Sequence, residues 1–260
     1  MRRRTTIKSV NMIEVSDHIT GNSYYGKPGR KIRSERKQVT PEAIRKNNLR
    51  MAEKQLRLLI DMNFKADDYY LTLTFKNEEE ELDAKEMIRK FFRKVRDLFN
   101  KKKTICKYIY VMEKQGRIHF HALLSRGIEL TTQLLKKLWP HGYTKIEYYR
   151  GEAEDAIGLA KYLMKERKSD IDHKDAQIRK KWVSSTNLEK PKVKKKILKA
   201  TEWRKDIKVP NGYYLDKDSV YEGVNNYGFP FRTYRLIRLP DWRGEYEQRK
   251  STKALSVLRE

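Results

Sequence analysis

Hydrophobic and polar residues alternate along DYYLTLTF, residues 68–75. Such alternation is typical of a strand with one buried and one more polar face. Three further segments predict strands, namely TICKYIYVME, RIHFHALLS and YTKIEYY. RIHFHALLS follows TICKYIYVME after only the short loop KQG, which predicts a hairpin.

Helical spacing of apolar residues separates these strands. Thr40, Pro41 and Glu42 predict the start of a first helix, because proline is favoured in the first turn. Asp83 predicts the start of a second helix, with a basic face opposite its apolar one. Two more helices are expected around LTTQLLKKLW and from about Glu152 to Lys168. The apolar face of the second helix comprises Met87, Ile88, Phe91, Val95 and Leu98.

The order strand, helix, strand, strand, helix, strand, helix predicts an α+β fold. It describes a ferredoxin-like, RRM-like βαββαβ antiparallel sheet with one further helix. We therefore expect a basic N-terminal arm and helix over residues 1–64 and a core over 65–170. Residues 171–260 are expected to be a basic extension that packs on the core or binds DNA.

Charge points to a polyanionic partner. The 260 residues include 60 Lys and Arg against 35 Asp and Glu, a net charge of +25. The excess lies in the flanks, since residues 1–60 carry +10, residues 61–160 carry +3 and residues 161–260 carry +12. Basic flanks favour sequence-independent contacts with nucleic acid phosphates, the alternative being a solvated surface that aids solubility.

The remaining composition indicates a cytoplasmic protein. Cys106 is the single cysteine, so it forms no internal disulfide, and no zinc-ligand spacing surrounds it. The basic start MRRRTTIKSV leads into a polar stretch where a signal peptide needs an apolar one. No run of about 18 apolar residues occurs, so no membrane contact is expected.

The segment GRIHFHALLS contains a candidate metal site. Side chains two residues apart on a strand share a face, so His119 and His121 point the same way while Ile118 and Phe120 enter the core. Two adjacent imidazoles are suited to holding a metal ion. The alternative is that two surface histidines merely alternate with core residues.

Glu113 joins the histidines only if the turn sets it on their face. A two-residue loop would place Glu113 opposite Ile118, on the wrong face. A three-residue loop, Lys114 to Gly116, would place it opposite Arg117, on the histidine face. We predict the second turn, which yields two nitrogens and one carboxylate oxygen. This set suits Mg²⁺ or Mn²⁺ with positions left for substrate oxygens.

The helix EDAIGLAKYLMKE contains a candidate nucleophile. Tyr162 and Lys165 are three residues apart and share a face, with Asp155 two turns earlier. A tyrosine can attack phosphorus, and a neighbouring lysine can orient the phosphate. The alternative is an amphipathic helix with a half-buried tyrosine and a solvated lysine.

Together these segments resemble the HUH-superfamily replication initiators, the rolling-circle endonucleases of phages and bacterial plasmids. YLTLTF is similar to their first motif, RIHFHALL to the histidine, hydrophobe, histidine motif, and AKYLMK to the tyrosine helix. WPHGYTKIEYY is similar to their connecting strand, and the likeness covers about residues 65–170.

The resemblance implies a nickase with a metal ion at His119 and His121 that polarises the scissile phosphate of single-stranded or hairpin origin DNA. Tyr162 would attack, form a 5′-phosphotyrosine link and free a 3′-hydroxyl as primer. A bacterial cell carrying a plasmid, phage or integrated element is the expected setting. The same chemistry serves mobilisation relaxases and single-strand transposases, while a non-catalytic RRM-like module is a different alternative.

One departure from the family concerns the tyrosine helix. Phage-type relatives carry two tyrosines four residues apart, and Gly158 stands at the earlier position here. A second strand transfer would then need a partner subunit in a homodimer, or release by activated water. No phosphate-binding GxxxxGK[ST] motif is present, so a host helicase and a host polymerase are the expected partners.

Further residues are candidates for DNA contacts. Arg117 and Lys161 lie beside the predicted site in sequence, and His141 in WPHGY is either a further metal ligand or a turn residue. The tyrosines of the C-terminal third could stack bases, or pack hairpins instead. These tyrosines are Tyr213, Tyr214, Tyr221, Tyr227 and Tyr234, and the arginines among them are Arg232, Arg235 and Arg238.

Overall fold

The chain divides into two compact units. In this computed structural model, residues 2–19, 40–78, 81–114, 117–164, 182–199, 203–224 and 229–240 are described. Residues 44–190 form one unit, here called the central unit. Residues 1–43 and 191–260 form the other, here called the terminal unit. The cuts thus fall after residues 43 and 190, whereas the sequence suggested cuts after residues 64 and 170.

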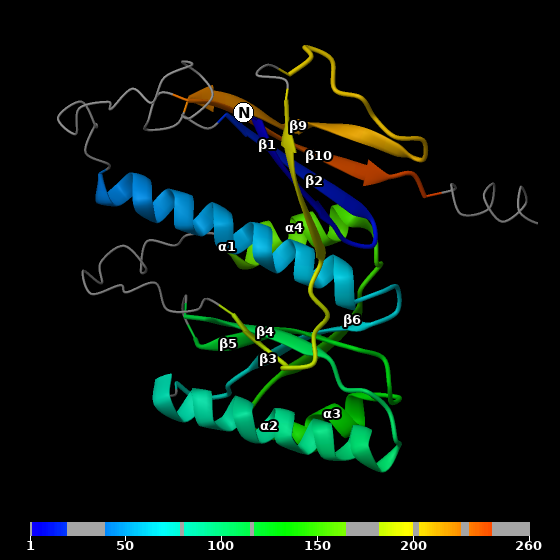
Figure 1. Cartoon of the computed structure of the whole chain (residues 1–260). Coiled ribbons are helices and arrows are strands. Elements are labelled where there is room, and N and C mark those ends of the chain that lie inside the picture. Colours follow the sequence, from blue (N-terminus) through cyan, green and yellow to red (C-terminus); the bar gives the residue numbers. More distant parts are fainter. Residues whose placement is uncertain are drawn as a thin grey trace, which may run out of the picture. The chain divides into compact units, whose positions relative to one another are not determined.

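The central unit contains a five-stranded antiparallel sheet with the order β6-β3-β5-β4-β7 (Figure 1). Four of its strands follow the ferredoxin-like order, in which the first and third strands in the chain lie at the centre. The predicted α+β, RRM-like fold is therefore confirmed. The strands are β3 (Tyr69–Thr74), β4 (Tyr108–Glu113), β5 (His119–Leu124), β6 (Thr144–Tyr148) and β7 (Val183–Ser184).

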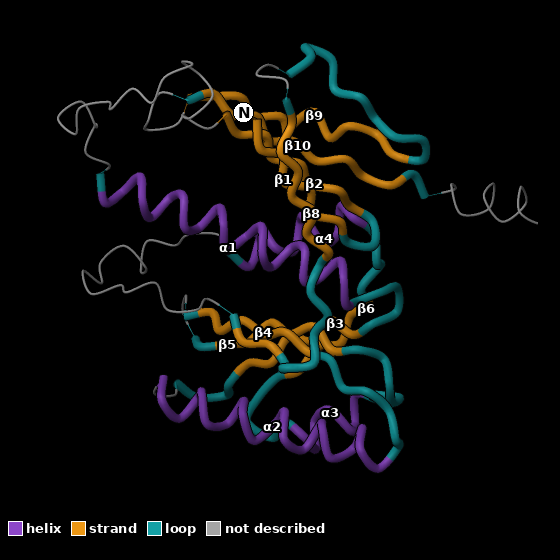
Figure 2. The backbone as a smooth tube through the Cα atoms, in the orientation of Figure 1, coloured by secondary structure: helices purple, strands orange, loops and turns teal. Residues whose placement is uncertain are grey.

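Helices cover both faces of this sheet. Helices α2 (Glu81–Lys101) and α3 (Thr132–Leu138) pack on one face, and α4 (Ala153–Leu163) lies on the other (Figures 1 and 2). Helix α1 (Pro41–Asn63) begins at the predicted proline. The fourth predicted helix is described only to Leu163, and its expected end at Lys168 lies outside the described residues.

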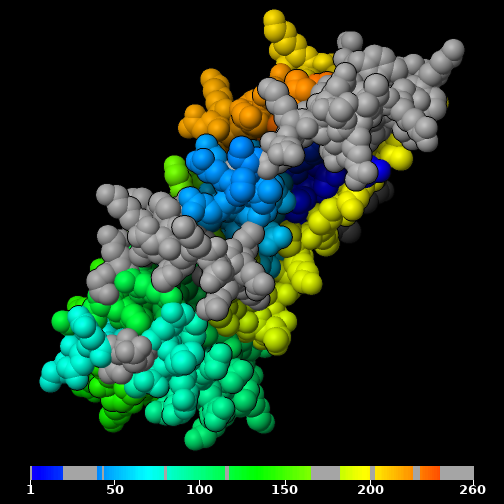
Figure 3. All heavy atoms as spheres, turned by 90° about the vertical axis from the view of Figure 1, so that its left-hand side faces the viewer, coloured from blue at the N-terminus to red at the C-terminus, as the bar shows by residue number. Residues whose placement is uncertain are grey.

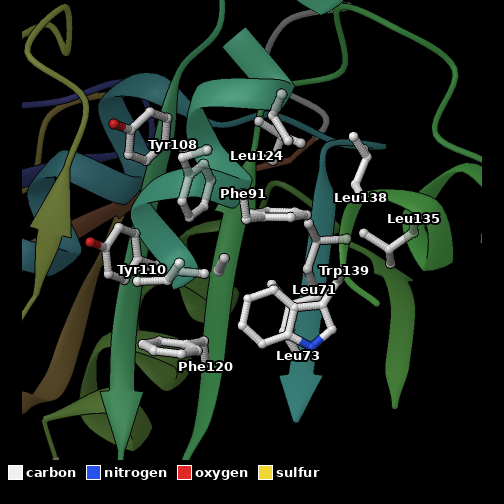
Figure 4. Close-up of a cluster of buried hydrophobic side chains, with 14 of the residues drawn as sticks. Leu71, Leu73, Phe91, Tyr108, Tyr110, Phe120, Leu124, Leu135, Leu138 and Trp139 are labelled. Atoms are coloured by element: carbon white, nitrogen blue, oxygen red, sulfur yellow. The ribbon is translucent and has the colours of Figure 1, made fainter. Parts of the chain in front are cut away.

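The core between the sheet and α2 and α3 is aromatic (Figure 4). Alternate residues of the strands, such as Leu71, Leu73 and Phe120, are fully buried there, as the alternation predicts. The Trp139 ring packs against Phe91 and Phe120, and its Nε1–H donates to a strand carbonyl at 2.9 Å. Because apolar burial is the main favourable term in folding, this core fixes the strands that carry the candidate site.

The outward side of α2 is basic, as predicted. Its arginines and lysines are exposed while its apolar residues are buried, and its side chains form part of the outer surface (turquoise in Figure 3). The exposed basic residues are Arg89, Lys90, Arg93, Lys94 and Arg96. None of the described helices is both long enough and apolar enough to span a bilayer.

The terminal unit contains a second five-stranded antiparallel sheet, with the order β8-β1-β2-β10-β9. Residues 2–19, expected to be part of a basic arm, instead form two of its strands. Its core includes Val15, Tyr234 and Leu236. The strands are β1 (Arg2–Lys8), β2 (Met12–Ile19), β8 (Lys192–Leu198), β9 (Tyr213–Val224) and β10 (Pro230–Arg238).

Charge neutralisation explains why such a basic segment can be a strand. Asp17 is fully buried and accepts hydrogen bonds from Arg4 Nε at 2.8 Å and Nη2 at 2.7 Å. Arg2 Nε lies 4.0 Å from the same carboxylate. The hydrogen bond to Asp17 raises the pKa of Arg4, although burial acts in the opposite direction. These arginines are therefore structural partners of a buried acid.

Candidate metal and tyrosine site

The β4–β5 hairpin sets Glu113 on the histidine face, but in a different register from the predicted one. Glu113 lies opposite His119, and Val111 lies opposite His121. The prediction of Glu113 opposite Arg117 is wrong, because five residues rather than three separate the paired strands. Both loops have an odd number of residues, so both preserve the face. Residues 115 and 116 lie outside the described part of the chain.

Three side chains of this hairpin converge. Glu113 Oε2 lies 3.4 Å from His119 Nε2 and 3.4 Å from His121 Nε2. The three candidate ligand atoms all lie within 4.8 Å of one another. Ligands at about 2.1 Å from one ion are about 3–3.4 Å apart, so both Glu–His separations fit a shared ion. The donor set of two imidazoles and one carboxylate fits a divalent metal, and Mn²⁺ better than Mg²⁺.

The backbone fixes the tautomer of His119. Its Nδ1 lies 3.0 Å from the carbonyl oxygen of Arg117. A carbonyl only accepts hydrogen bonds, so Nδ1 carries the proton and donates. In the neutral ring, Nε2 then keeps its lone pair on the side of Glu113. His119 is therefore oriented as a ligand before any ion binds.

Hydroxyl groups of β3 hold His121. Its Nδ1 lies 3.0 Å from Tyr70 Oη and 3.4 Å from Thr72 Oγ1, and the Tyr70 and His121 rings are parallel within 2°. Burial, together with the charges of Tyr162, Glu147 and Glu113, raises the pKa of the Tyr70 phenol. A neutral hydroxyl can accept the Nδ1–H of His121, which leaves Nε2 for an ion.

Tyr70 and Thr72 were not among the candidate site residues. The signal that could have found them is the alternation in YLTLTF, which sets both on the polar face of their strand. In the sheet, Thr72 lies directly opposite His121 and Tyr70 lies opposite Leu123. The first motif thus supplies the residues that orient the second.

Tyr162 approaches this group from α4. Its ring centroid lies 5.6 Å from that of His121, at an interplanar angle of 78°. The tyrosine is 47% exposed, so its ring is reachable from solvent. The opposite side of α4 buries Ala153, Ala156 and Ala160. A Cβ at Gly158 would meet no atom within 4 Å, so space does not exclude a larger residue there.

The other helix candidates differ in their surroundings. Asp155 Oδ2 accepts the backbone N–H of Glu152 at 3.3 Å and completes a capping box at the start of α4. Asp155 therefore stabilises the helix and is not part of the metal-ligand group found in the described residues. Lys161 is exposed in the last turn. Lys165 lies outside the described residues.

His141 and Arg117 lie at the rim of the sheet. His141 occupies a turn, where its ring packs on Trp139 with centroids 5.0 Å apart and on Phe75 at 6.1 Å. This placement matches the turn alternative, and the ligand group of the described chain omits His141. Arg117 is exposed, and its Nη1 donates to the Phe75 carbonyl at 3.5 Å.

The three C-terminal arginines have partners inside the terminal unit. The Arg232 side chain is 3% exposed, donates to the Arg204 carbonyl at 2.9 Å, and lies over the Trp203 ring. Arg235 pairs with Asp216 at 2.9 Å, and Arg238 lies over Tyr213. These contacts do not present the arginines to DNA. Among the tyrosines, Tyr234 is buried, Tyr214 and Tyr221 are exposed, and Tyr227 lies outside the described residues.

Comparisons with known proteins add a family to this geometry. No curated protein matches the chain. The crystal structure of the hypothetical protein ORF119 from Sulfolobus islandicus rod-shaped virus 1 is 18% identical, covers 44% of this chain and 90% of its own, and superposes with a TM-score of 0.30. Residues 68–167, which include all three hairpin ligands and Tyr162, match the family described as Replication-associated protein ORF2, and this match supports a replication initiator.

Proposed function

We propose that this replication initiator nicks single-stranded or hairpin origin DNA, with Tyr162 as the nucleophile. The observation that carries the proposal is the Tyr162 ring 5.6 Å from the ring of His121, which belongs to the group of three converging ligands. A phenol beside a divalent metal group suits attack on a phosphodiester. The family match favours replication over mobilisation or transposition.

The reaction exchanges one phosphate ester for another. Tyr162 Oη forms a bond to phosphorus while the bond from phosphorus to the 3′-oxygen breaks. The phenolic proton is lost to solvent, and the leaving 3′-oxygen gains one. The products are a 5′-phosphotyrosine link and a free 3′-hydroxyl, which a host polymerase can extend. When bound by Glu113, His119 and His121, a divalent ion would supply Lewis-acid polarisation of the phosphate.

The chain's own residues would position the substrate. Arg117 at the hairpin and Lys161 on α4 are exposed and positively charged, so both can hold phosphates beside the site. Lys165 is proposed to orient the scissile phosphate. With one tyrosine in the helix motif, a second transfer requires a partner subunit or water. A host helicase is proposed to unwind the DNA.

A covalent adduct tests the proposal. The full chain is incubated with Mn²⁺ and end-labelled single-stranded oligonucleotides from the encoding element, and adducts that survive denaturation are separated on a gel. The wild type should form an adduct, and Tyr162→Phe should form none because it lacks the attacking oxygen. Tyr148→Phe, which removes the hydroxyl of another exposed tyrosine of the central unit, is the matched control and should react normally.

Two results would contradict the proposal. An undiminished adduct with Tyr162→Phe would assign the nucleophile elsewhere. The absence of an adduct with every origin-derived oligonucleotide, despite binding, would favour a non-catalytic binding module.

A further inference from the structure

Three aromatic rings lie side by side on one face of the terminal sheet. His18 of β2 and Phe231 of β10 are direct cross-strand partners, and their rings are stacked with centroids 5.9 Å apart and 19° between planes. Tyr221 of β9 follows on the other side of Phe231, with centroids 5.6 Å apart and 51° between planes. We call these three residues the ring row. It crosses three adjacent strands.

The ring row is open to solvent. Tyr221 is 53% exposed, His18 is exposed and Phe231 is half-buried. Gly223 lies opposite Phe231, and a Cβ there would come within 3.3 Å of the Phe231 ring. The missing side chain therefore leaves room for the ring beside β9. Aromatic pairs that served only to stabilise the sheet would gain by deeper burial.

Positive charge borders the ring row. Arg3 lies directly opposite His18 and so shares its face, and Arg3 is exposed. Lys195 of β8, also exposed, lies opposite Thr5 on that face. Two acids of the same face, Glu14 and Asp216, are paired with Arg235 at 3.6 Å and 2.9 Å. The border of the row thus offers cations to a phosphate backbone.

We propose that the ring row binds single-stranded DNA by stacking bases on His18, Phe231 and Tyr221, with Arg3 and Lys195 contacting phosphates. Exposed rings beside cations on a sheet are the combination that recognises single strands independently of sequence. A duplex hides the faces of its bases, so it fits the row less well. The choice of DNA rather than RNA rests on the proposed function. The central unit would then perform the chemistry while the terminal unit holds the strand.

Binding measured without chemistry tests the inference separately from nicking. Fluorescence anisotropy is recorded for a labelled oligothymidylate of about 20 nucleotides, with a chelator present and in a Tyr162→Phe background. Phe231→Ala and Tyr221→Ala should each weaken binding about 5-fold to 100-fold, because each removes a stacking surface. Tyr214→Ala, which removes an exposed tyrosine at the other end of β9, is the matched control and should bind normally.

Two further variants separate stacking from structure and charge. Phe231→Leu keeps apolar volume, so circular dichroism and thermal unfolding should show an intact fold while binding still weakens. Arg3→Ala should reduce the slope of log affinity against log salt by about 0.7, as expected for one lost phosphate contact. The ring variants should leave this slope unchanged.

The outcomes are distinguishable from those of the nicking test. Wild-type affinity in Phe231→Ala and Tyr221→Ala would overturn the inference, even if the adduct forms. Weakened binding in both variants would support it, even if no adduct forms. Tighter binding of the matching oligoribonucleotide would assign the row to RNA, and tighter binding of a duplex would refute stacking.

Discussion

Both units contain a five-stranded antiparallel sheet, yet they bury different kinds of side chain. The central sheet buries a large aromatic core in which Phe91, Phe120 and Trp139 touch. The terminal sheet has a smaller apolar cluster around Val15 and Tyr234 and a fully buried acid, Asp17, held by arginines. We infer that the first sheet depends mainly on apolar packing, whereas the second depends in part on a charge pair.

The difference extends to what each sheet exposes. The polar face of the central sheet gathers two imidazoles and a carboxylate, groups suited to a metal ion. The corresponding feature of the terminal sheet is the ring row, suited to bases. One architecture thus presents either metal ligands or a stacking surface, depending on which residues alternate with the core.

The largest effect on this comparison is expected from Asp17→Asn. The substitution leaves Arg4 and Arg2 without their buried carboxylate, which should destabilise the terminal unit by about 2–4 kcal/mol because one side of a buried pair is lost. Urea denaturation followed by circular dichroism measures the change. The double variant Arg4→Met with Asp17→Leu should cost less than the single one. Equal stability of Asp17→Asn and wild type would show that the pair contributes nothing.

A smaller effect, confined to the metal group, is expected from Tyr70→Phe. The variant removes the hydroxyl 3.0 Å from His121 Nδ1 while keeping the ring, so Mn²⁺ should bind about 10-fold to 100-fold more weakly. Calorimetric titration of Mn²⁺ checks this without any reaction. Tyr69→Phe is the control, because that hydroxyl bonds backbone groups on the other face of the sheet. Unchanged Mn²⁺ affinity in Tyr70→Phe would leave Thr72 as the residue that orients His121.

The smallest effect is expected from Glu81→Gln at the start of α2. Hydrogen bonds from Lys114 and Lys85 lower the pKa of Glu81 from 4.5 to about 2. A carboxyl whose pKa is depressed in the folded state adds stability above pH 4.5, and that stability disappears as pH falls toward about 2. Because Glu81 is partly exposed, the loss at pH 7 should be under about 1 kcal/mol.

Denaturation at pH 7 and at low pH measures this contribution. The difference between wild type and Glu81→Gln should shrink in acid. Glu86→Gln, which breaks a fully exposed pair with Lys90 on the same helix, is the control. A difference that grows in acid would contradict the assigned ion pairs.

The sequence predicted the central sheet because its strands alternate cleanly. DYYLTLTF and RIHFHALLS each set apolar residues on one side, and the structure buries Leu71, Leu73 and Phe120 there. The face of Glu113 was also correct, since the face depends only on whether the loop is odd or even. Its register was wrong, because loop length between two strands is not determined by the strands themselves.

The terminal sheet escaped prediction for a physical reason. Charged residues usually indicate solvent, but Arg4 is held by a buried acid that lies 13 residues further along the chain. Arg232 was expected at DNA, yet it is enclosed by the Trp203 and Tyr234 rings. The ring row was also invisible, because His18 and Phe231 become neighbours only through a pairing of distant strands.

The order of strands in the terminal sheet has a consequence for synthesis on the ribosome. Strand β2 emerges early, but its neighbour β10 follows only after the whole central unit has been translated. At about 5–20 residues per second, this wait lasts on the order of ten seconds or more. The central unit can therefore collapse first, while two unpaired N-terminal strands remain available to chaperones or to nascent neighbours.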